Sequence, residues 1–338
     1  MTELTTLTVR EPEDILALVP YVLGFIPEES LVLLTAGDVG ESFHARVDLP
    51  DDPSDLDLAV DPLVDAALRN GVRKAMVVVY SEDGCLALDA WHRLREDLLE
   101  IGVDVVVSLR TFGGRYLVID NPDSEWTSYD VEAHPISALA VYDGRVTYRT
   151  RQELSDSLVT TDPEAVDALE ELCDKATRRL AGTARHPLGP PTPEHLRSTL
   201  VAEALWARER LRLAVQEGSV LEDPDAARML AALISAEVRD VLWAEIRRLG
   251  ARKHVAFWTD LVRRSPAEFA APPAALLAFA AWMAGEGALA WCALDRCREA
   301  DPGYSMAALI ASCLQAAMPP SAFKPIDPAS LTLFAGER

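Results

Sequence analysis

Residues 74–110, KAMVVVYSEDGCLALDAWHRLREDLLEIGVDVVVSLR, decide the fold of the first half of the chain. The stretch begins and ends with continuous apolar runs, Lys74–Tyr80 and Asp104–Arg110, which are typical of strands buried on both faces of a sheet. Between these runs, Leu86–Ile101 carries apolar residues at helical spacing and is followed by Gly102. A strand, a helix and a strand in this order predict two parallel strands joined by a right-handed crossover.

Hairpin patterns flank this central unit. Leu31–Thr35 and Ser42–Leu49 are joined by the turn sequence AGDVGE, and the glycines of TFGGRYLVID turn the chain back into Arg115–Asp120. A helix is expected to open at Asp61-Pro62, between the first hairpin and the central unit. The whole pattern predicts a mixed-sheet α/β domain over residues 1–160.

Residues 19–34, VPYVLGFIPEESLVLL, contain two prolines and a glycine that interrupt regular secondary structure. Glu13–Leu23 is expected to form a short helix that Pro20 kinks and Gly24 ends in the left-handed conformation, and Pro27 fixes the exit. If the strand that follows is parallel to the central strands, this segment is a joint at their amino ends. If it is antiparallel, the segment forms the rim of the edge where α/β sheets bind ligands.

The second half of the chain has only helical patterns. The expected helix starts are Asp162-Pro163, Thr192-Pro193, Asp223-Pro224 and the capping box Ser265–Glu268. A proline-rich connector, residues 185–193, separates the first two helices. Two further helices around Gly285–Gly287 carry small residues near the spacing of a tetratricopeptide repeat. We therefore predict a tetratricopeptide-like helical domain over residues 161–320 and a tail over residues 321–338.

Charge is distributed unevenly along the chain. The 338 residues carry a net charge of −22, which argues against direct nucleic-acid binding because the surface repels a polyanion. Residues 1–160 hold 30 acidic and 12 basic residues, whereas residues 161–338 hold 24 and 20. The acidic half either meets cations or a basic partner or is only a solubilising surface, and we favour the solubilising surface. Mimicry of a nucleic acid is a weaker alternative.

Two features that the sequence lacks indicate the cellular compartment of the protein. The N-terminus does not have the basic-then-apolar order of a signal peptide, and no apolar run is long enough to cross a bilayer, so we expect a cytoplasmic protein. Five scattered cysteines without a C-x-x-C pair favour reduced thiols over disulfides or a zinc site.

Four segments together resemble a known family. They are P-x-x-L-G-F-x-P-x-x-S-L-V at Pro20–Val32, RVDLP at Arg46–Pro50, the strand ending at Tyr80, and LLAF-x-AW-x-x-G-x-GALA…DPGYS at Leu276–Ser305. The chain resembles, over nearly its entire length, the actinobacterial family called domain of unknown function 4192. The resemblance implies no activity, substrate or cofactor, because the family has none assigned. Many members carry cysteines after the GRYW-like strand, but GGRYLVIDNPDSEWTSYDVEAHP here contains none, so the resemblance supports no metal or redox role for this segment.

Polar residues at the ends of the predicted strands form the candidate ligand site. They are Asp48, Tyr80, Glu82, Asp83 and Arg110. If the strands are adjacent, three carboxylates meet near one tyrosine and suit a hydrated divalent cation or a cationic group. The alternative, which we favour, is that Asp48 and the SEDG turn have only local structural roles.

Arg115 completes the set of candidates. It follows the tight Gly113-Gly114 turn and is expected to pair either with an acidic ligand or with Asp120, and we favour Asp120. The usual phosphate-binding glycine loops are absent, as is the residue order of a calcium loop in residues 48–61. The histidines have neither helical metal spacing nor an accompanying G-x-S-x-G sequence.

Two functional hypotheses remain. The first is a cytoplasmic binding or interaction protein with a small-ligand or cation crevice at the strand ends and a helical domain that contacts a protein partner. The second is a metal-assisted hydrolase with Asp48, Glu82 and Asp83 as ligands and Tyr80 as an acid or orienting group. No cofactor beyond a divalent cation is indicated.

Overall fold

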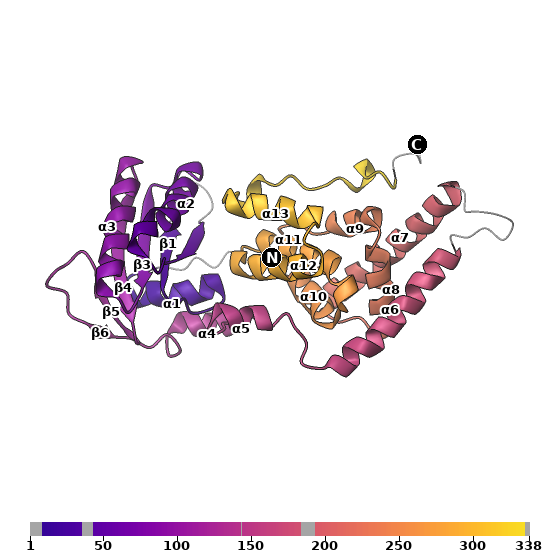
Figure 1. Ribbon diagram of the computed structural model, residues 1–338, viewed down its shortest axis with the longest axis horizontal. Coiled ribbons are helices and arrows are strands. Elements are labelled where there is room, and N and C mark those ends of the chain that lie inside the picture. The colour runs from indigo at the N-terminus through magenta and orange to yellow at the C-terminus, as the bar shows by residue number, and fades with distance from the viewer. Residues whose placement is uncertain (1–8, 36–42, 143, 184–192, 335–338) are drawn as a thin grey trace. The chain divides into compact units, whose positions relative to one another are not determined.

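The computed structural model describes residues 9–35, 43–142, 144–183 and 193–334 (Figure 1). The AGDVGE turn and most of the proline-rich connector lie outside these described residues. The chain divides into two compact units. The α/β unit contains residues 1–153 and 315–319, and the helical unit contains residues 154–314 and 320–338.

The described residues of the α/β unit form one six-stranded mixed sheet in the order β2-β1-β3-β4-β5-β6. The strands are β1 (Ser30–Thr35), β2 (His44–Asp48), β3 (Lys74–Tyr80), β4 (Asp104–Phe112), β5 (Arg115–Val118) and β6 (Thr127–Ser128). Only β3 and β4 are parallel, and every other neighbouring pair is antiparallel. The predicted mixed sheet is thus confirmed, whereas the two-residue strand β6 was not expected because it is too short to show a pattern.

Helices cover both faces of this sheet. They are α1 (Pro12–Leu23), α2 (Leu56–Arg69), α3 (Gly84–Glu100) and α4 (Pro135–Tyr142), and the short helix α5 (Arg151–Asp156) follows them in the chain. Val77 and Val79 of β3 pack with α2 and α3, whereas Val78 and Tyr80 pack with α1 and α4. The alternation follows from the period of two in a strand, and it explains why both faces are apolar.

Helix α2 begins earlier than the sequence predicted. The start expected at Asp61-Pro62 is wrong, because Pro62 lies inside the helix and the helix begins at Leu56. Asp52 marks the real start: its carboxylate accepts a hydrogen bond from the Ser54 amide at 2.9 Å and caps the short 3-10 turn Pro53–Asp55 that leads into α2. The stretch contains two Asp-Pro pairs, Asp52-Pro53 and Asp61-Pro62, and the first pair forms the turn that leads into α2.

The segment of residues 19–34 forms a rim and not a distant joint. Gly24 has a φ of +80° and its amide donates to the Pro20 carbonyl at 2.8 Å, so it ends α1 as expected. Because β1 is antiparallel to β3, Ser30 lies opposite Tyr80. The loop before β1 is consequently placed where β3 ends, at the edge that carries the predicted ligand site.

The described part of the helical unit contains helices and 3-10 turns and no strand. They are α6 (Pro163–Thr183), α7 (Pro193–Glu217), α8 (Asp223–Leu233), α9 (Ala236–Trp243), α10 (Ala251–Arg264), η2 (Ala267–Phe269), α11 (Ala271–Met283), α12 (Gly287–Ala300), α13 (Ser305–Gln315), η3 (Pro320–Ala322) and η4 (Pro328–Ser330). Among them, no helix is long and apolar enough to span a membrane.

One predicted cap in this unit is wrong. Ser265 does not cap a helix, because its hydroxyl donates to the Leu261 carbonyl at 2.7 Å and so binds the last turn of α10. The expected helix pair around Gly285–Gly287 is present as α11 and α12, which pack against each other. Every residue of α11 is buried, so this helix forms the centre of the helical unit.

Candidate functional site

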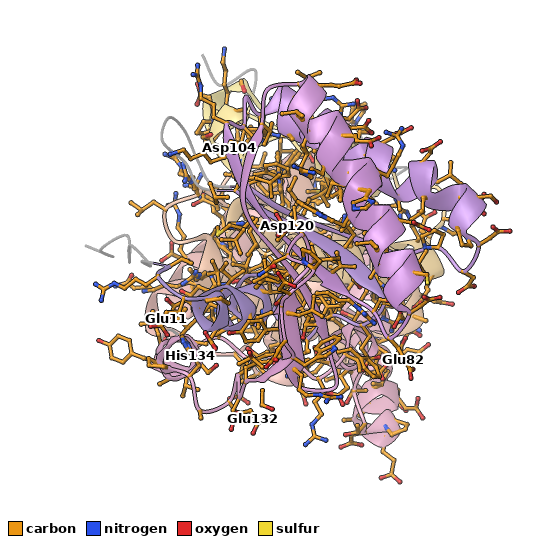
Figure 2. The ribbon with its side chains drawn as sticks, turned by 90° about the vertical axis from the view of Figure 1, so that its left-hand side faces the viewer. Glu11, Glu82, Asp104, Asp120, Glu132 and His134 are labelled. Atoms are coloured by element: carbon orange, nitrogen blue, oxygen red, sulfur yellow. The ribbon has the colours of Figure 1, made fainter. Side chains whose placement is uncertain are left out.

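The carboxyl ends of β2, β3 and β4 lie at one edge of the sheet, here named the carboxyl edge. Ser30 at the start of β1 is aligned with both Asp48 and Tyr80, and Tyr80 is aligned with Thr111 of β4. Figure 2 shows Glu82 beyond one end of the sheet and Asp104, where β4 begins, near the other. The strand-end positions predicted from the sequence therefore share one edge.

The three predicted carboxylates do not converge on one point. Strand β1 lies between β2 and β3, so Asp48 is separated from the end of β3 by two strand spacings, roughly 10 Å. The carboxylate of Asp83 accepts hydrogen bonds from the amides of Cys85 and Leu86, at 2.8 and 3.2 Å, and caps α3. Within the described residues, no three Asp, Glu, His or Cys side chains form a group able to hold a metal ion.

Tyr80 points away from the carboxyl edge. Its side chain packs among α1 and the residues on that face of the sheet, and only 6% of its surface is exposed. Burial raises the pKa of its phenol well above the usual value, with a smaller contribution from Tyr129. The structure therefore does not place Tyr80 as an acid or an orienting group beside Glu82 and Asp83.

Glu29 is the residue at this edge that the sequence did not reveal. Its carboxylate accepts a hydrogen bond from the Ser81 hydroxyl at 2.6 Å and another from the Glu82 amide at 2.9 Å. Its backbone φ is +35°, in the left-handed region that residues other than glycine seldom adopt. Glu29 thus ties the loop before β1 to the turn after β3, and no spacing rule indicates a contact between residues so far apart in the chain.

Arg110 is held by main-chain carbonyls. Its Nε donates to the Ser81 carbonyl at 3.3 Å and its Nη2 donates to the Glu82 carbonyl at 2.7 Å. Its Nη1 lies so close to Gly84 that a Cβ on that glycine would be 2.8 Å away. The guanidinium also lies over the Trp126 ring, 5.2 Å from the centroid, which fixes its plane.

Arg115 shares the same tryptophan. Its guanidinium carbon lies 5.7 Å from the centroid of the Trp126 ring. The expected ion pair between Arg115 and Asp120 is not formed, because the side chain lies over Trp126 instead. The structure therefore brings Arg110 and Arg115 together on one aromatic residue.

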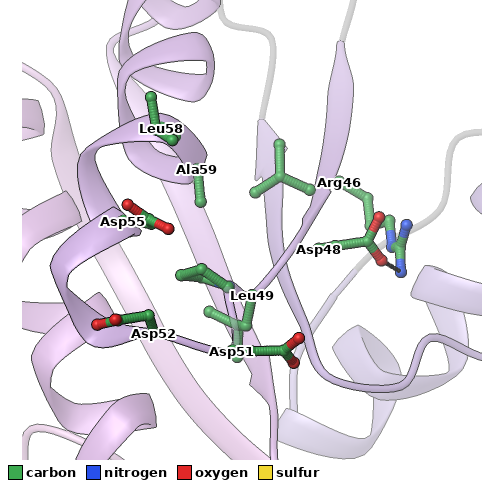
Figure 3. Close-up of a pocket in the computed structure, with 10 residues that line it drawn as sticks. Arg46, Asp48, Leu49, Asp51, Asp52, Asp55, Leu58 and Ala59 are labelled. Atoms are coloured by element: carbon green, nitrogen blue, oxygen red, sulfur yellow. Dashed lines mark hydrogen bonds and ion pairs between the residues drawn. The ribbon is translucent and has the colours of Figure 1, made fainter.

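A surface pocket of about 640 Å³ lies at the far end of the carboxyl edge, between β2 and the start of α2 (Figure 3). Four carboxylates line it, from Asp48, Asp51, Asp52 and Asp55, and its apolar part includes Leu49, Leu58 and Ala59. Figure 3 shows Asp52 and Asp55 on one side of Leu49 and Asp48 on the other. The pocket combines negative charge with apolar surface.

The carboxylates of this pocket differ in their partners. Asp48 forms an ion pair with Arg46, whose guanidinium also binds the Ser30 hydroxyl. Asp52 is occupied in capping, and this hydrogen bond to Ser54 lowers the pKa of its carboxyl. The side chains of Asp51 and Asp55 have no hydrogen-bond or ion-pair partner among the described residues, so their charges are available to a ligand.

Two histidines of the α/β unit, His134 and His44, have structural surroundings. His134 contacts the Asp14 carboxylate through Nε2 at 3.1 Å, while its Nδ1 accepts a hydrogen bond from the Ile136 amide at 3.3 Å, so neither nitrogen remains for catalysis. Burial lowers the pKa of His44 to about 4. These arrangements give no support to a catalytic triad through either residue.

Comparison with known proteins gives one match. The family model described as "Domain of unknown function (DUF4192)" matches residues 12–321. No curated protein and no solved structure matches the chain.

Proposed function

This chain belongs to the DUF4192 family, whose description assigns no function, and we propose that it is a binding protein whose α/β unit recognises a cationic side chain in the pocket beside β2. The ligand is an extended, basic segment of a partner protein. The observation that carries the proposal is a pair of carboxylates, Asp51 and Asp55, that have no partner among the described residues and lie beside apolar side chains at an edge of the described sheet.

The pocket has the two parts that a lysine or arginine side chain requires. Such side chains bury an aliphatic stem on apolar surface while the charged end binds carboxylates. Leu49 and Leu58 supply the apolar surface, and Asp51 and Asp55 supply the charge. A simple metal ion has no use for the apolar part and requires several oxygen ligands around one point.

The edge of β2 favours an extended ligand. The amide of Leu49 donates to the Glu29 carbonyl at 2.9 Å, so the odd-numbered residues of β2 face β1. The backbone groups of His44, Arg46 and Asp48 consequently point away from β1, and no described strand pairs with them. An added strand can pair with these groups and place an alternate side chain in the pocket.

The charge of the α/β domain supports the same partner. Residues 1–160 carry 18 more acidic than basic residues, since they hold 30 and 12. A basic segment is attracted over a long distance by this excess. The proposal thus keeps the predicted recognition of a cationic group, with Asp48 at the rim of the pocket.

The metal-assisted hydrolase has no observation in its favour. It requires Asp48, Glu82 and Asp83 to meet, and β1 separates the first from the other two. The helical unit remains our proposed site for a protein partner, with the α11–α12 pair as its tetratricopeptide-like part. A cytoplasmic location likewise remains part of this proposal.

Calorimetric titration of the full chain with two peptides tests the proposal. The probes are an acetylated, amidated Thr-Val-Lys-Val-Arg-Val peptide and the same peptide with acetyl-lysine and citrulline in the basic positions. We expect only the basic peptide to bind. Replacing both free carboxylates, Asp51→Asn with Asp55→Asn, should weaken binding about tenfold, or 1.4 kcal/mol.

The control is Asp89→Asn, which removes one exposed charge on α3 outside the pocket and should leave the affinity unchanged within about twofold. Equal binding of the charged and neutral peptides, or no binding of the basic peptide at millimolar concentration, would falsify the proposal. An equal loss in the control and in the double variant would show that the charge of the whole domain, and not the pocket, attracts the peptide.

A further inference from the structure

Two arginines of the carboxyl edge stack on one exposed tryptophan. Arg110 and Arg115 lie 5.2 and 5.7 Å from the centroid of Trp126, and 39% of the Trp126 surface is exposed. Phe112, whose Cα is aligned with that of Arg115 across β4 and β5, is 42% exposed. Arg110, Arg115, Trp126 and Phe112 are here named the Arg–Trp patch.

Four other arginines that lie over aromatic rings also hold a carboxylate. Arg46 over Phe25 pairs with Asp48, and Arg228 over Trp206 pairs with Glu203 at 2.9 Å. The same holds for Arg239 over Tyr304, which pairs with Asp240, and for Arg298 over Trp291, which pairs with Asp295. Stacking and ion pairing thus occur together at four sites.

Arg110 and Arg115 differ from these four arginines. Neither forms an ion pair with a carboxylate among the described residues, although they lie in the acidic half of the chain. Arg110 donates only to the main-chain carbonyls of Ser81 and Glu82. Two guanidinium groups therefore face solvent at one place where an anion would complete their ion pairing.

The Arg–Trp patch is organised before any ligand arrives. Two hydrogen bonds hold Arg110, and Gly84 leaves the space that its Nη1 fills. Binding then costs less side-chain entropy than it would for a freely rotating arginine. Exposed tryptophan and arginine together are also the residues that contribute most to protein interfaces.

We propose that the Arg–Trp patch binds a short acidic segment of a partner protein, with its carboxylates on the two guanidinium groups and an apolar side chain on Trp126 and Phe112. The main-chain carbonyl of Glu82 binds Arg110, so the acidic residues Glu82 and Asp83 belong to the same turn, and a phosphate with two negative charges is repelled by this turn more than a single carboxylate is. The net charge of the domain repels a long polyanion more strongly than a short peptide, which favours a peptide over a nucleic acid. This site is separate from the basic-segment pocket and has the opposite preference.

The test is titration of the full chain with two peptides, followed through the tryptophan indole N–H resonances. The probes are an acetylated, amidated Glu-Leu-Glu-Phe-Glu-Glu peptide and its counterpart with glutamine in place of glutamate. Trp126→Phe identifies the Trp126 resonance. We expect the acidic peptide to shift this resonance and the glutamine peptide to leave it in place.

Arg115→Gln is the informative variant, because the side-chain nitrogens of Arg115 form no hydrogen bond to any residue that the structure describes. This substitution should weaken the binding of the acidic peptide about tenfold. The matched control is Arg298→Gln, which removes an arginine over another tryptophan and should change nothing at Trp126. An unshifted Trp126 resonance, equal affinity for both peptides, or equal affinity of the Arg115→Gln and parent chains overturns the proposal. Inorganic phosphate binding more tightly than the acidic peptide overturns the choice of partner.

Discussion

The carboxylate of Glu29 accepts a hydrogen bond from the hydroxyl of Ser81, 52 residues later in the chain, at a distance of 2.6 Å. Ser81 in turn accepts a hydrogen bond from the Asp83 amide at 3.1 Å, and Asp83 caps α3. The rim before β1 and the first turn of α3 are therefore joined through one serine. This connection holds the carboxyl edge together, although Glu29 itself is exposed.

The contribution of Glu29 can be divided into side chain and backbone. Glu29→Ala removes both accepted hydrogen bonds and keeps the left-handed backbone, so we expect a loss of about 2 kcal/mol in the free energy of unfolding. Glu29→Gly removes the same hydrogen bonds but relieves the positive φ, and it should lose about 1 kcal/mol less. Urea denaturation of both variants measures the difference. Glu28→Ala, a change in the neighbouring exposed residue, serves as the control and should stay within about 0.5 kcal/mol. A glycine variant less stable than the alanine variant contradicts the backbone argument.

Pro62 should limit the stability of α2. As a proline inside the helix, it lacks the amide that would donate to the Leu58 carbonyl. Because Pro62 is exposed, Pro62→Ala needs no repacking, and it should raise the free energy of unfolding by about 1 kcal/mol after the loss of proline's effect on the unfolded chain. Pro53→Ala is the matched control, since Pro53 occupies a first-turn position that suits proline, and it should lower stability slightly. Thermal unfolding of both variants shows whether each substitution raises or lowers stability. A Pro62→Ala chain that is less stable than the parent chain contradicts the prediction.

The sequence predicts the elements of this fold better than it predicts the contacts of the site. Apolar runs place β3 and β4 and their helix correctly, because burial on both faces leaves a local signature in Lys74–Tyr80. The order of strands is not local, and the position of β1 between β2 and β3 is what separates Asp48 from Asp83. Trp126 and Glu29 were missed for the same reason, since both act through residues distant in the chain.

Gly84 should matter for ligand binding more than for stability. Alanine at this position brings a Cβ within 2.8 Å of Arg110 Nη1, and the flexible arginine, not the backbone, must move. Because alanine favours the helix, Gly84→Ala should change the free energy of unfolding by less than about 1 kcal/mol. The same substitution should nevertheless weaken the binding of the acidic peptide several-fold, because Arg110 can no longer keep its position over Trp126. Gly287→Ala, at the first position of α12 with open space around it, is the matched control and should leave peptide binding unaltered. Equal peptide affinities of the two variants contradict the role of Gly84.

The helical unit should lose stability in mild acid through His254. This histidine of α10 is buried, and its Nδ1 has no hydrogen-bond partner in the described part of the chain. Burial lowers its pKa to about 4, against a smaller opposing effect of Glu245. Between that pKa and the usual value of 6.5, the unfolded chain binds a proton that the folded chain does not. Stability from this residue is therefore complete above pH 6.5 and falls by about 3 kcal/mol as the pH decreases to 4.

His254→Leu removes this titrating group and places an apolar side chain of similar size in the core. Between pH 6.5 and 4, the free energy of unfolding of the variant should fall less steeply than that of the parent chain. The difference in free energy of unfolding between the two chains should therefore change by about 2–3 kcal/mol in favour of the variant across this range. Guanidinium denaturation at half-unit pH steps measures both slopes. Because every other titrating group is common to the two chains, the difference between the slopes belongs to His254. Parallel slopes would show that His254 takes up its proton in the folded chain as readily as in the unfolded one.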